Sequence, residues 1–61
     1  MIVKVEIDGR IYRVRQRDGY VLIYKYYPNG KYFRDMLVWS SRRDPVPAVG
    51  STTARVLARA T

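Results

Sequence analysis

Apolar and polar residues alternate through most of the first forty residues, in segments separated by short turn sequences. The turns are Asp-Gly at residues 8–9, Asp-Gly at residues 18–19 and Pro-Asn-Gly at residues 28–30. Alternation is the pattern of a β-strand with one buried face. Asp-Gly between two such segments favours a type I′ hairpin turn, because both residues tolerate a positive φ. We therefore expect four antiparallel strands in a meander, at residues 2–7, 10–17, 20–27 and 31–40.

Two-residue turns at the Asp-Gly pairs determine which side chains share a face of the sheet. One face is apolar and is the predicted core, formed by Val3, Val5, Ile7, Tyr12, Val14, Val21 and Ile23. The other, which we call the basic face, carries Lys4, Glu6, Ile11, Arg13, Arg15, Arg17, Leu22, Tyr24 and Tyr26. Burial of an unpaired charge costs several kcal/mol, so we expect the basic face to lie in solvent.

The third hairpin has two possible registers. A plain two-residue turn at Asn29-Gly30 would place Tyr32 and Arg34 on the core face. The alternative is a type I turn followed by a glycine with positive φ, together with a bulge. In that register each side chain of the fourth strand lies on the other face of the sheet. We choose the bulged register because it buries Phe33, Leu37 and Trp39. It also places Tyr32, Arg34, Met36 and Val38 on the basic face, and leaves Lys25 and Asp35 on the core face.

The character of the chain changes after Ser41. Residues 42–50 form a basic, proline-containing linker, because proline disfavours helix at the residue before it. Residues 51–61 follow as a short helix over 53–60, capped by Ser51 or Thr52, or as a disordered tail. A helix this short needs to dock Val56 and Leu57 on the core face. Its arginines, Arg55 and Arg59, are expected in solvent. The sheet is thus expected to form one domain over residues 1–41.

The composition argues against catalysis and favours a polyanionic partner. The 61 residues include no cysteine and no histidine, and the net charge is +7 with a pI near 10.3. The usual general base and the commonest metal ligand are therefore missing, so we expect no enzyme activity, metal or cofactor. Nine of the twelve cations are arginine, which suits planar contacts to phosphate. We also find no membrane-spanning run and no signal peptide, and expect a cytoplasmic, nucleoid-associated monomer.

The basic face combines groups for phosphate and for bases. Arginines can bind phosphate oxygens, tyrosines can stack on bases of single strands, and apolar side chains can act as wedges in a minor groove. Arg42 and Arg43 in the linker could reach a nucleic-acid backbone. With few Asn or Gln side chains and no recognition helix, we expect little sequence preference. The candidate contacts are Lys4, Arg13, Arg15, Arg17, Leu22, Tyr24, Tyr26, Lys31, Tyr32, Arg34, Met36, Arg42 and Arg43.

Residues 21–34, above all Gly-Lys-Tyr-Phe-Arg at 30–34, resemble the last hairpin of the small crenarchaeal chromatin proteins, and Val3-Lys4-Val5 resembles their first strand. The resemblance implies an SH3-like, partly open barrel of four to five strands that binds duplex DNA without sequence specificity. It implies contacts by Tyr32 and Arg34, and by Leu22, Tyr24 and Tyr26. Arg13 or Tyr12 stands where that family has a central tryptophan. A second crenarchaeal chromatin protein, which binds single- and double-stranded DNA, is an alternative source of the resemblance.

Other functions remain open at this point. The same charge and aromatic residues would serve an RNA-binding or ribosome-associated module. A protein-interaction or virion structural protein could pair through an exposed strand edge. The arm-binding domain of a tyrosine recombinase is a further alternative. Finally, arginine–tyrosine pairs across strands can simply stabilise an exposed sheet.

Overall fold

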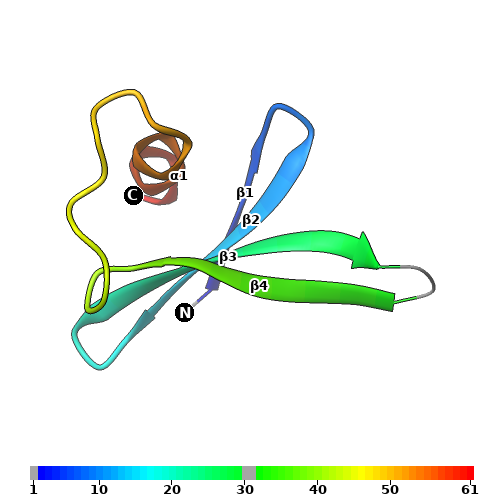
Figure 1. The fold of residues 1–61 in the computed structure, drawn as a ribbon, viewed down its shortest axis with the longest axis horizontal. Coiled ribbons are helices and arrows are strands. Elements are labelled where there is room, and N and C mark those ends of the chain that lie inside the picture. The colour runs from blue at the N-terminus through cyan, green and yellow to red at the C-terminus, as the bar shows by residue number, and fades with distance from the viewer. Residues whose placement is uncertain (1, 30–31) are drawn as a thin grey trace.

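The computed structural model describes the backbone of residues 2–29 and 32–61, and the side chains of residues 2–26 and 35–61. Over these residues the chain forms an antiparallel sheet and a C-terminal helix (Figure 1). The strands follow one another across the sheet in chain order, as expected for a meander. The elements are β1 (Ile2–Ile7), β2 (Arg10–Arg17), β3 (Tyr20–Asn29), β4 (Tyr32–Ser40) and α1 (Thr52–Ala60).

Both Asp-Gly turns adopt the conformation that the sequence predicts. Asp8 and Gly9 have φ angles of 52° and 77°, and Asp18 and Gly19 have φ angles of 50° and 82°. Two successive positive φ angles characterise the type I′ turn, whose twist matches that of the strands it joins. The registers of β1 with β2 and of β2 with β3 follow directly from these turns and confirm the predicted pairing.

The third hairpin contains a bulge, but not at the turn where we expected it. The register shifts by one residue between Ile23 and Tyr24. Ile23 pairs with Trp39 and Tyr24 pairs with Leu37, so Val38 is the extra residue on β4. Trp39 packs against the core, as predicted. The bulge therefore lies in mid-strand, beside the residue whose burial it permits.

The position of the bulge decides the faces of the residues between it and the turn. Asp35 pairs with Tyr26, and Met36 pairs with Lys25. Residues paired directly across a sheet share a face, so Asp35 lies on the basic face and Met36 on the opposite one. Both predictions are wrong for the same reason. A register displaced by one residue moves Asp35 and Met36 each to the other face.

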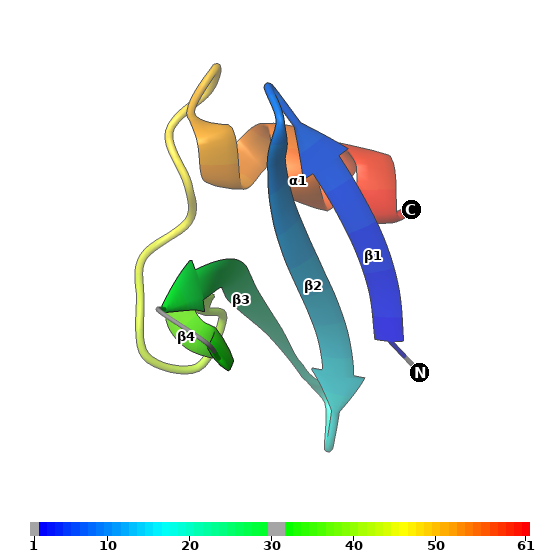
Figure 2. The same ribbon diagram turned by 90° about the vertical axis from the view of Figure 1, so that its right-hand side faces the viewer.

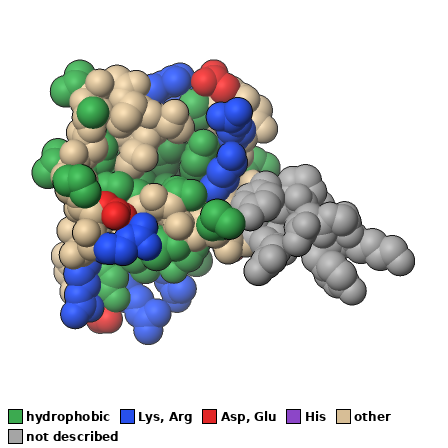
Figure 3. All heavy atoms as spheres, in the orientation of Figure 1, with side chains coloured by type: hydrophobic (Ala, Val, Ile, Leu, Met, Phe, Trp, Pro, Cys, Tyr) green, Lys and Arg blue, Asp and Glu red, His purple; other side chains and the backbone are tan. Residues whose placement is uncertain are grey.

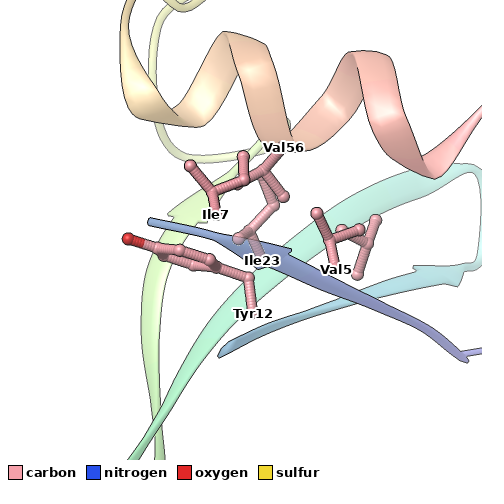
Figure 4. Packing of buried hydrophobic residues seen from close by; sticks show 6 residues of the cluster. Val5, Ile7, Tyr12, Ile23 and Val56 are labelled. Atoms are coloured by element: carbon pink, nitrogen blue, oxygen red, sulfur yellow. The ribbon is translucent and has the colours of Figure 1, made fainter. Parts of the chain in front are cut away.

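α1 covers the apolar face of the sheet over β1 and β2, the strands with which it makes most of its contacts. Val56 on the helix has no exposed surface and points toward Ile7 and Ile23 on the sheet (Figure 4). The buried core cluster comprises Val5, Ile7, Tyr12, Val14, Ile23 and Val56. Five partly buried apolar residues pack against this cluster, namely Val3, Val21, Trp39, Leu57 and Ala60.

The C-terminal segment folds as a helix, rather than as a disordered tail, and is held at several points. The Ser51 side chain accepts a hydrogen bond from the Ala54 backbone N–H at 3.1 Å, which caps the helix. Arg55 and Arg59 are exposed, as expected, but both contact the first hairpin. Arg55 Nη1 lies 3.4 Å from an Asp8 carboxylate oxygen. Arg59 Nη1 donates to the Glu6 backbone carbonyl at 2.8 Å.

The linker leaves the sheet through a compact turn. The Ser40 backbone N–H donates to Asp44 Oδ2 at 2.9 Å, and the Asp44 N–H donates to the Ser40 carbonyl at 2.8 Å. Trp39 Nε1 donates to the Pro45 carbonyl at 3.0 Å, which fastens the start of the linker to β4. Beyond Pro45, the Val46 and Val49 side chains of the linker are exposed to solvent.

The sheet is twisted and open, with β1 and β4 at its edges. Figures 1 and 2 show the β1–β2 hairpin diverging from the end of β3 and the start of β4. The predicted class, a mainly β antiparallel meander with a short C-terminal helix, is confirmed, and the sheet is open, in keeping with the expected partly open fold. Within the described part of the chain, no helix has the length and apolar character needed to cross a bilayer.

Candidate nucleic-acid interface

Three of the four arginines of β2, namely Arg13, Arg15 and Arg17, lie on the face of the sheet that α1 does not cover. Arg13 pairs with Tyr24 on β3, and Arg17 pairs with Tyr20. Because alternate residues of a strand share a face, Arg15 lies between them on the same side. Arg15 and Arg17 are exposed, and the Arg13 side chain is 40% exposed. On β1, Lys4 is exposed beside Arg13.

Arg13 is held in place by two neighbours on the basic face. Its Nη1 lies 3.1 Å from Asp35 Oδ2, and its guanidinium carbon lies 4.5 Å from the centre of the Tyr26 ring. The ion pair is exposed on both sides, so it contributes little to stability. It does fix the orientation of the guanidinium group, because the tyrosine ring and the carboxylate restrain it from different directions.

A shallow hollow of about 220 Å³ opens beside this pair. Arg15 borders it and forms no ion pair with any described residue. Tyr24 contributes its half-buried ring, and Ile2 adds an exposed apolar side chain. The basic face thus has a concave region in which cations and an aromatic ring border the same space.

Tyr20 extends the basic face toward the linker. The guanidinium carbon of Arg42 lies 5.4 Å from the centre of the Tyr20 ring, within the range of cation–π attraction. Arg17 lies beside Tyr20 and approaches Asp18 at 3.7 Å, with both side chains largely exposed. A pair this long and this exposed leaves Arg17 available to other anions. Of the two linker arginines, Arg42 therefore belongs with the strand residues.

Arg43 is placed differently, because its guanidinium group is taken up by the adjacent carboxylate. Arg43 Nη2 lies 2.8 Å from Asp44 Oδ2 and its Nε donates to the same group. This hydrogen bond is the main cause that raises the pKa of Arg43. It is also the main cause that lowers the pKa of Asp44, ahead of the bond from the Ser40 N–H. A phosphate bound by Arg43 would lie beside the Asp44 carboxylate, which would repel it.

The apolar residues expected to serve as wedges do not form one exposed group. Leu22 is only 9% exposed, so its expected exposure is wrong. It lies in the middle of the sheet, paired with Arg15 on one side and Ser40 on the other. Met36 is exposed but lies on the opposite face, as described above. Leu37, expected in the core, instead pairs with Tyr24 and so lies on the basic face.

Some candidate contacts lie outside the described part of the structure. Lys31 is not described, and for Tyr32 and Arg34 only the backbone, within β4, is described. The same holds for Phe33, whose predicted burial is therefore also outside the described residues. The backbone register pairs Arg34 with Tyr27 and Tyr32 with Asn29, out of step with the pair of Tyr26 and Asp35, so it does not bear out their predicted placement on the basic face. The contacts that the resemblance assigns to Tyr32 and Arg34 stay predictions.

Sequence reasoning missed two residues of this surface. Tyr20 follows the Asp18-Gly19 turn, so the same register that placed Arg17 could have placed Tyr20 beside it. Asp35 was assigned to the wrong face because the bulge was expected at the turn. Burial of Trp39 is satisfied by a bulge at the turn as well as by one in mid-strand, so it gave no signal for the position of the bulge.

Positive charge is not confined to the basic face. On the side of the molecule that Figure 3 presents, Lys and Arg side chains lie in several separate places, one of them at the end where β2 turns into β3. The basic face is distinguished by its regular row of arginines with tyrosines beside them, rather than by charge alone. Among the described residues, no group of three or more acidic, His or Cys side chains could hold a metal ion.

Comparisons with models of protein families, with curated proteins and with solved structures found no match.

Proposed function

We propose that this protein binds nucleic acid through the basic face, with duplex DNA as its main partner and with little dependence on sequence. The observation that carries the proposal is the row of Arg13, Arg15 and Arg17 along one side of β2, with tyrosines of β3 beside it. On the opposite face, α1 is docked over β1 and β2, so a large ligand can approach these two strands through the face that carries the row. The resemblance to crenarchaeal chromatin proteins supports the same reading, as does the net charge of +7.

Weak sequence preference follows from the chemistry of the face. Arginine side chains on a twisted sheet can contact phosphates along a backbone, and such contacts carry no base information by themselves. The amide side chains that read adenine are scarce, and Gln16 lines a hollow on the helix side of the sheet beside Leu57. Binding should therefore depend on charge and shape, in keeping with a chromosome-associated role.

A salt titration tests the proposal most directly. For the wild type, four to five phosphate contacts predict a slope of about −4 in a plot of log affinity against log salt for duplex DNA. Arg13→Ala combined with Arg15→Ala should reduce that slope by about 2, since each lost contact removes roughly 0.9. Affinity at low salt should fall as well. Fluorescence anisotropy with a labelled duplex measures both quantities.

The matched control removes the same charge elsewhere. Arg10→Ala combined with Arg55→Ala also lowers the net charge by two, but Arg10 pairs with Ile7 on the helix side and Arg55 lies on α1. This variant should keep most of the wild-type slope. Equal losses in the two double variants would show that overall charge, rather than the basic face, drives binding. Competition by structured RNA in the same assay tests the RNA-binding alternative.

A further inference from the structure

Asp35 is the residue of the hollow that phosphate binding does not explain. The hollow is bordered by two arginines, a tyrosine and an isoleucine, all of which suit a nucleotide. A carboxylate among them repels phosphate and can only accept hydrogen bonds when ionised. Its partner in an unstacked nucleic acid would therefore be a base, which carries N–H donors.

We propose that the hollow receives one unstacked base of a single-stranded nucleic acid, and that Asp35 accepts hydrogen bonds from the Watson–Crick edge of that base, with guanine preferred. The inference rests on the proposed function, because it assumes that the strand is attracted to the basic face. It adds a preference among bases that the row of arginines alone would not produce.

The size of the hollow suits a single ring system. Its volume of about 220 Å³ is below the roughly 300–1,000 Å³ of pockets that enclose a whole small-molecule ligand. A base could occupy it while the sugar and phosphate remain outside. Tyr24 supplies an aromatic surface at the border, and Arg15 supplies a cation at the same border for the attached phosphate. Stacking on an aromatic ring and contact with a cation are the usual elements of single-strand binding.

The arrangement of Asp35 leaves part of its carboxylate available. Oδ2 accepts the hydrogen bond from Arg13 Nη1, and Asp35 forms no other hydrogen bond with a described residue. The side chain is 37% exposed. Arg13 thus holds the carboxylate in position, while Oδ1 and the second lone pair of Oδ2 can both accept hydrogen bonds from a ligand.

The donors on the bases give the expected order of preference. Guanine presents a ring N–H and an amino group side by side on its Watson–Crick edge, which match the two oxygens of one carboxylate. Adenine and cytosine present one amino group each, and thymine and uracil present one ring N–H. These edges are occupied in a duplex but free in a single strand, where proteins commonly read them. The preference should therefore appear only with single strands.

The test compares strands that differ in a single base. The probes are a strand of twelve thymidines, the same strand with one central guanine, adenine or cytosine, and the corresponding uridine RNA strands. At fixed low salt, wild-type protein should bind the guanine-containing strand about tenfold more tightly than the thymidine strand, the discrimination expected of a bidentate contact to one base. DNA and RNA should give the same preference, because the proposed contact does not involve the sugar.

Two variants make the test specific. Asp35→Asn should abolish the preference for guanine while binding the thymidine strand and duplex DNA at least as tightly as the wild type, since a negative charge is removed. Asp18→Asn is the matched control: it removes the same charge at an exposed turn residue near Arg17 and should keep the preference. Circular dichroism confirms that both variants fold.

The outcomes separate this inference from the function on which it rests. Equal affinity of the wild type for the guanine and thymidine strands overturns the inference, and so does a preference that persists in Asp35→Asn. Neither result affects the proposal that the basic face binds phosphates. Absence of salt-dependent binding to every strand and duplex would overturn the proposed function itself.

Discussion

Val56 connects the helix to the sheet through a side chain with no exposed surface. It contacts a core built from only a few apolar residues, because the chain is short. For 61 residues the total free energy of unfolding is expected to be roughly 3–9 kcal/mol. One well-packed side chain is therefore a substantial part of the stability of the fold.

Replacement of Val56 by alanine should lower the free energy of unfolding by about 2 kcal/mol, through lost burial and the cavity left behind. Urea unfolding followed by circular dichroism measures the change. Val49→Ala is the matched control, because the Val49 side chain is fully exposed in the linker and its truncation should change stability by less than about 0.5 kcal/mol. Similar midpoints for the two variants would contradict the docking of α1 on the sheet.

At the same scale, Arg13 is already restrained before any ligand arrives. Its guanidinium group lies between the Tyr26 ring and Asp35, whereas Arg15 forms no ion pair with a described residue. Ordering a long side chain on binding costs roughly 0.5–1.5 kcal/mol. The Arg13 side chain is already ordered in the folded protein, so its contact with a ligand should be better defined than that of Arg15.

At the scale of elements, the turn from Ser40 to Asp44 couples stability to pH. The hydrogen bond from Arg43 is the main cause that lowers the pKa of Asp44 below its ordinary value of 3.8, followed by the bond from the Ser40 N–H. A carboxyl group with a lower pKa in the folded state stabilises that state above its unfolded pKa. The stabilisation is lost as pH falls through the folded pKa.

The wild type should therefore lose stability between about pH 5 and pH 2, and Asp44→Asn should lose less over the same interval. Urea midpoints at pH 7 and at pH 3 measure the difference. Arg43→Ala removes the larger cause of the shift and should flatten the profile in the same direction. If Asp44→Asn retained the full wild-type dependence on pH, other carboxylates would account for it.

Elements defined by local chemistry could be predicted from the sequence, whereas the third hairpin could not. Asp8-Gly9 and Asp18-Gly19 each determine a turn type, and the turn determines the register of the strands on both sides. The helix was predictable from Ser51 as a cap and from its apolar side. The bulge at Val38 depends instead on how Trp39 packs against the sheet, which no local pattern encodes.

The residues of the candidate site also differ in whether the sequence could predict their position. The row of arginines on β2 and its tyrosine neighbours follow from alternation and the second turn, so their common face was predictable. Asp35 lies on this face only because of the mid-strand bulge, and it is one of the residues that line the hollow. The low exposure of Leu22 was also beyond the pattern, because alternation assigns a face but not how deeply a residue lies within it.

For the molecule as a whole, the open edge at β1 is the feature that needs protection. In a hairpin with a two-residue turn, the residues beside the turn exchange both backbone hydrogen bonds, and alternate residues do the same. The backbone groups of Glu6, Lys4 and Ile2 therefore point away from β2. Arg59 from α1 donates to one of them, the Glu6 carbonyl. The helix thus covers part of an edge that could otherwise pair with another chain.

Arg59→Ala should increase self-association of the protein by up to about tenfold, since one backbone hydrogen bond contributes roughly 0.5–1.5 kcal/mol. Sedimentation equilibrium over a range of protein concentrations measures it. Arg55→Ala removes the same charge from the same helix, but Arg55 contacts the Asp8 side chain and leaves the edge unchanged. If both variants remained monomeric to the same degree, the edge would be protected by something other than Arg59.

The order of strands in the sheet also bears on how the chain acquires its structure. Every strand pairs with its neighbour in sequence, so each hairpin closes a loop of only a few residues and little chain entropy opposes it. Topologies dominated by such nearby pairings fold quickly for their size. The docking of α1 onto β1 joins opposite ends of the chain instead. We expect the hairpins at the two Asp-Gly turns to form first, and α1 to dock on β1 afterwards.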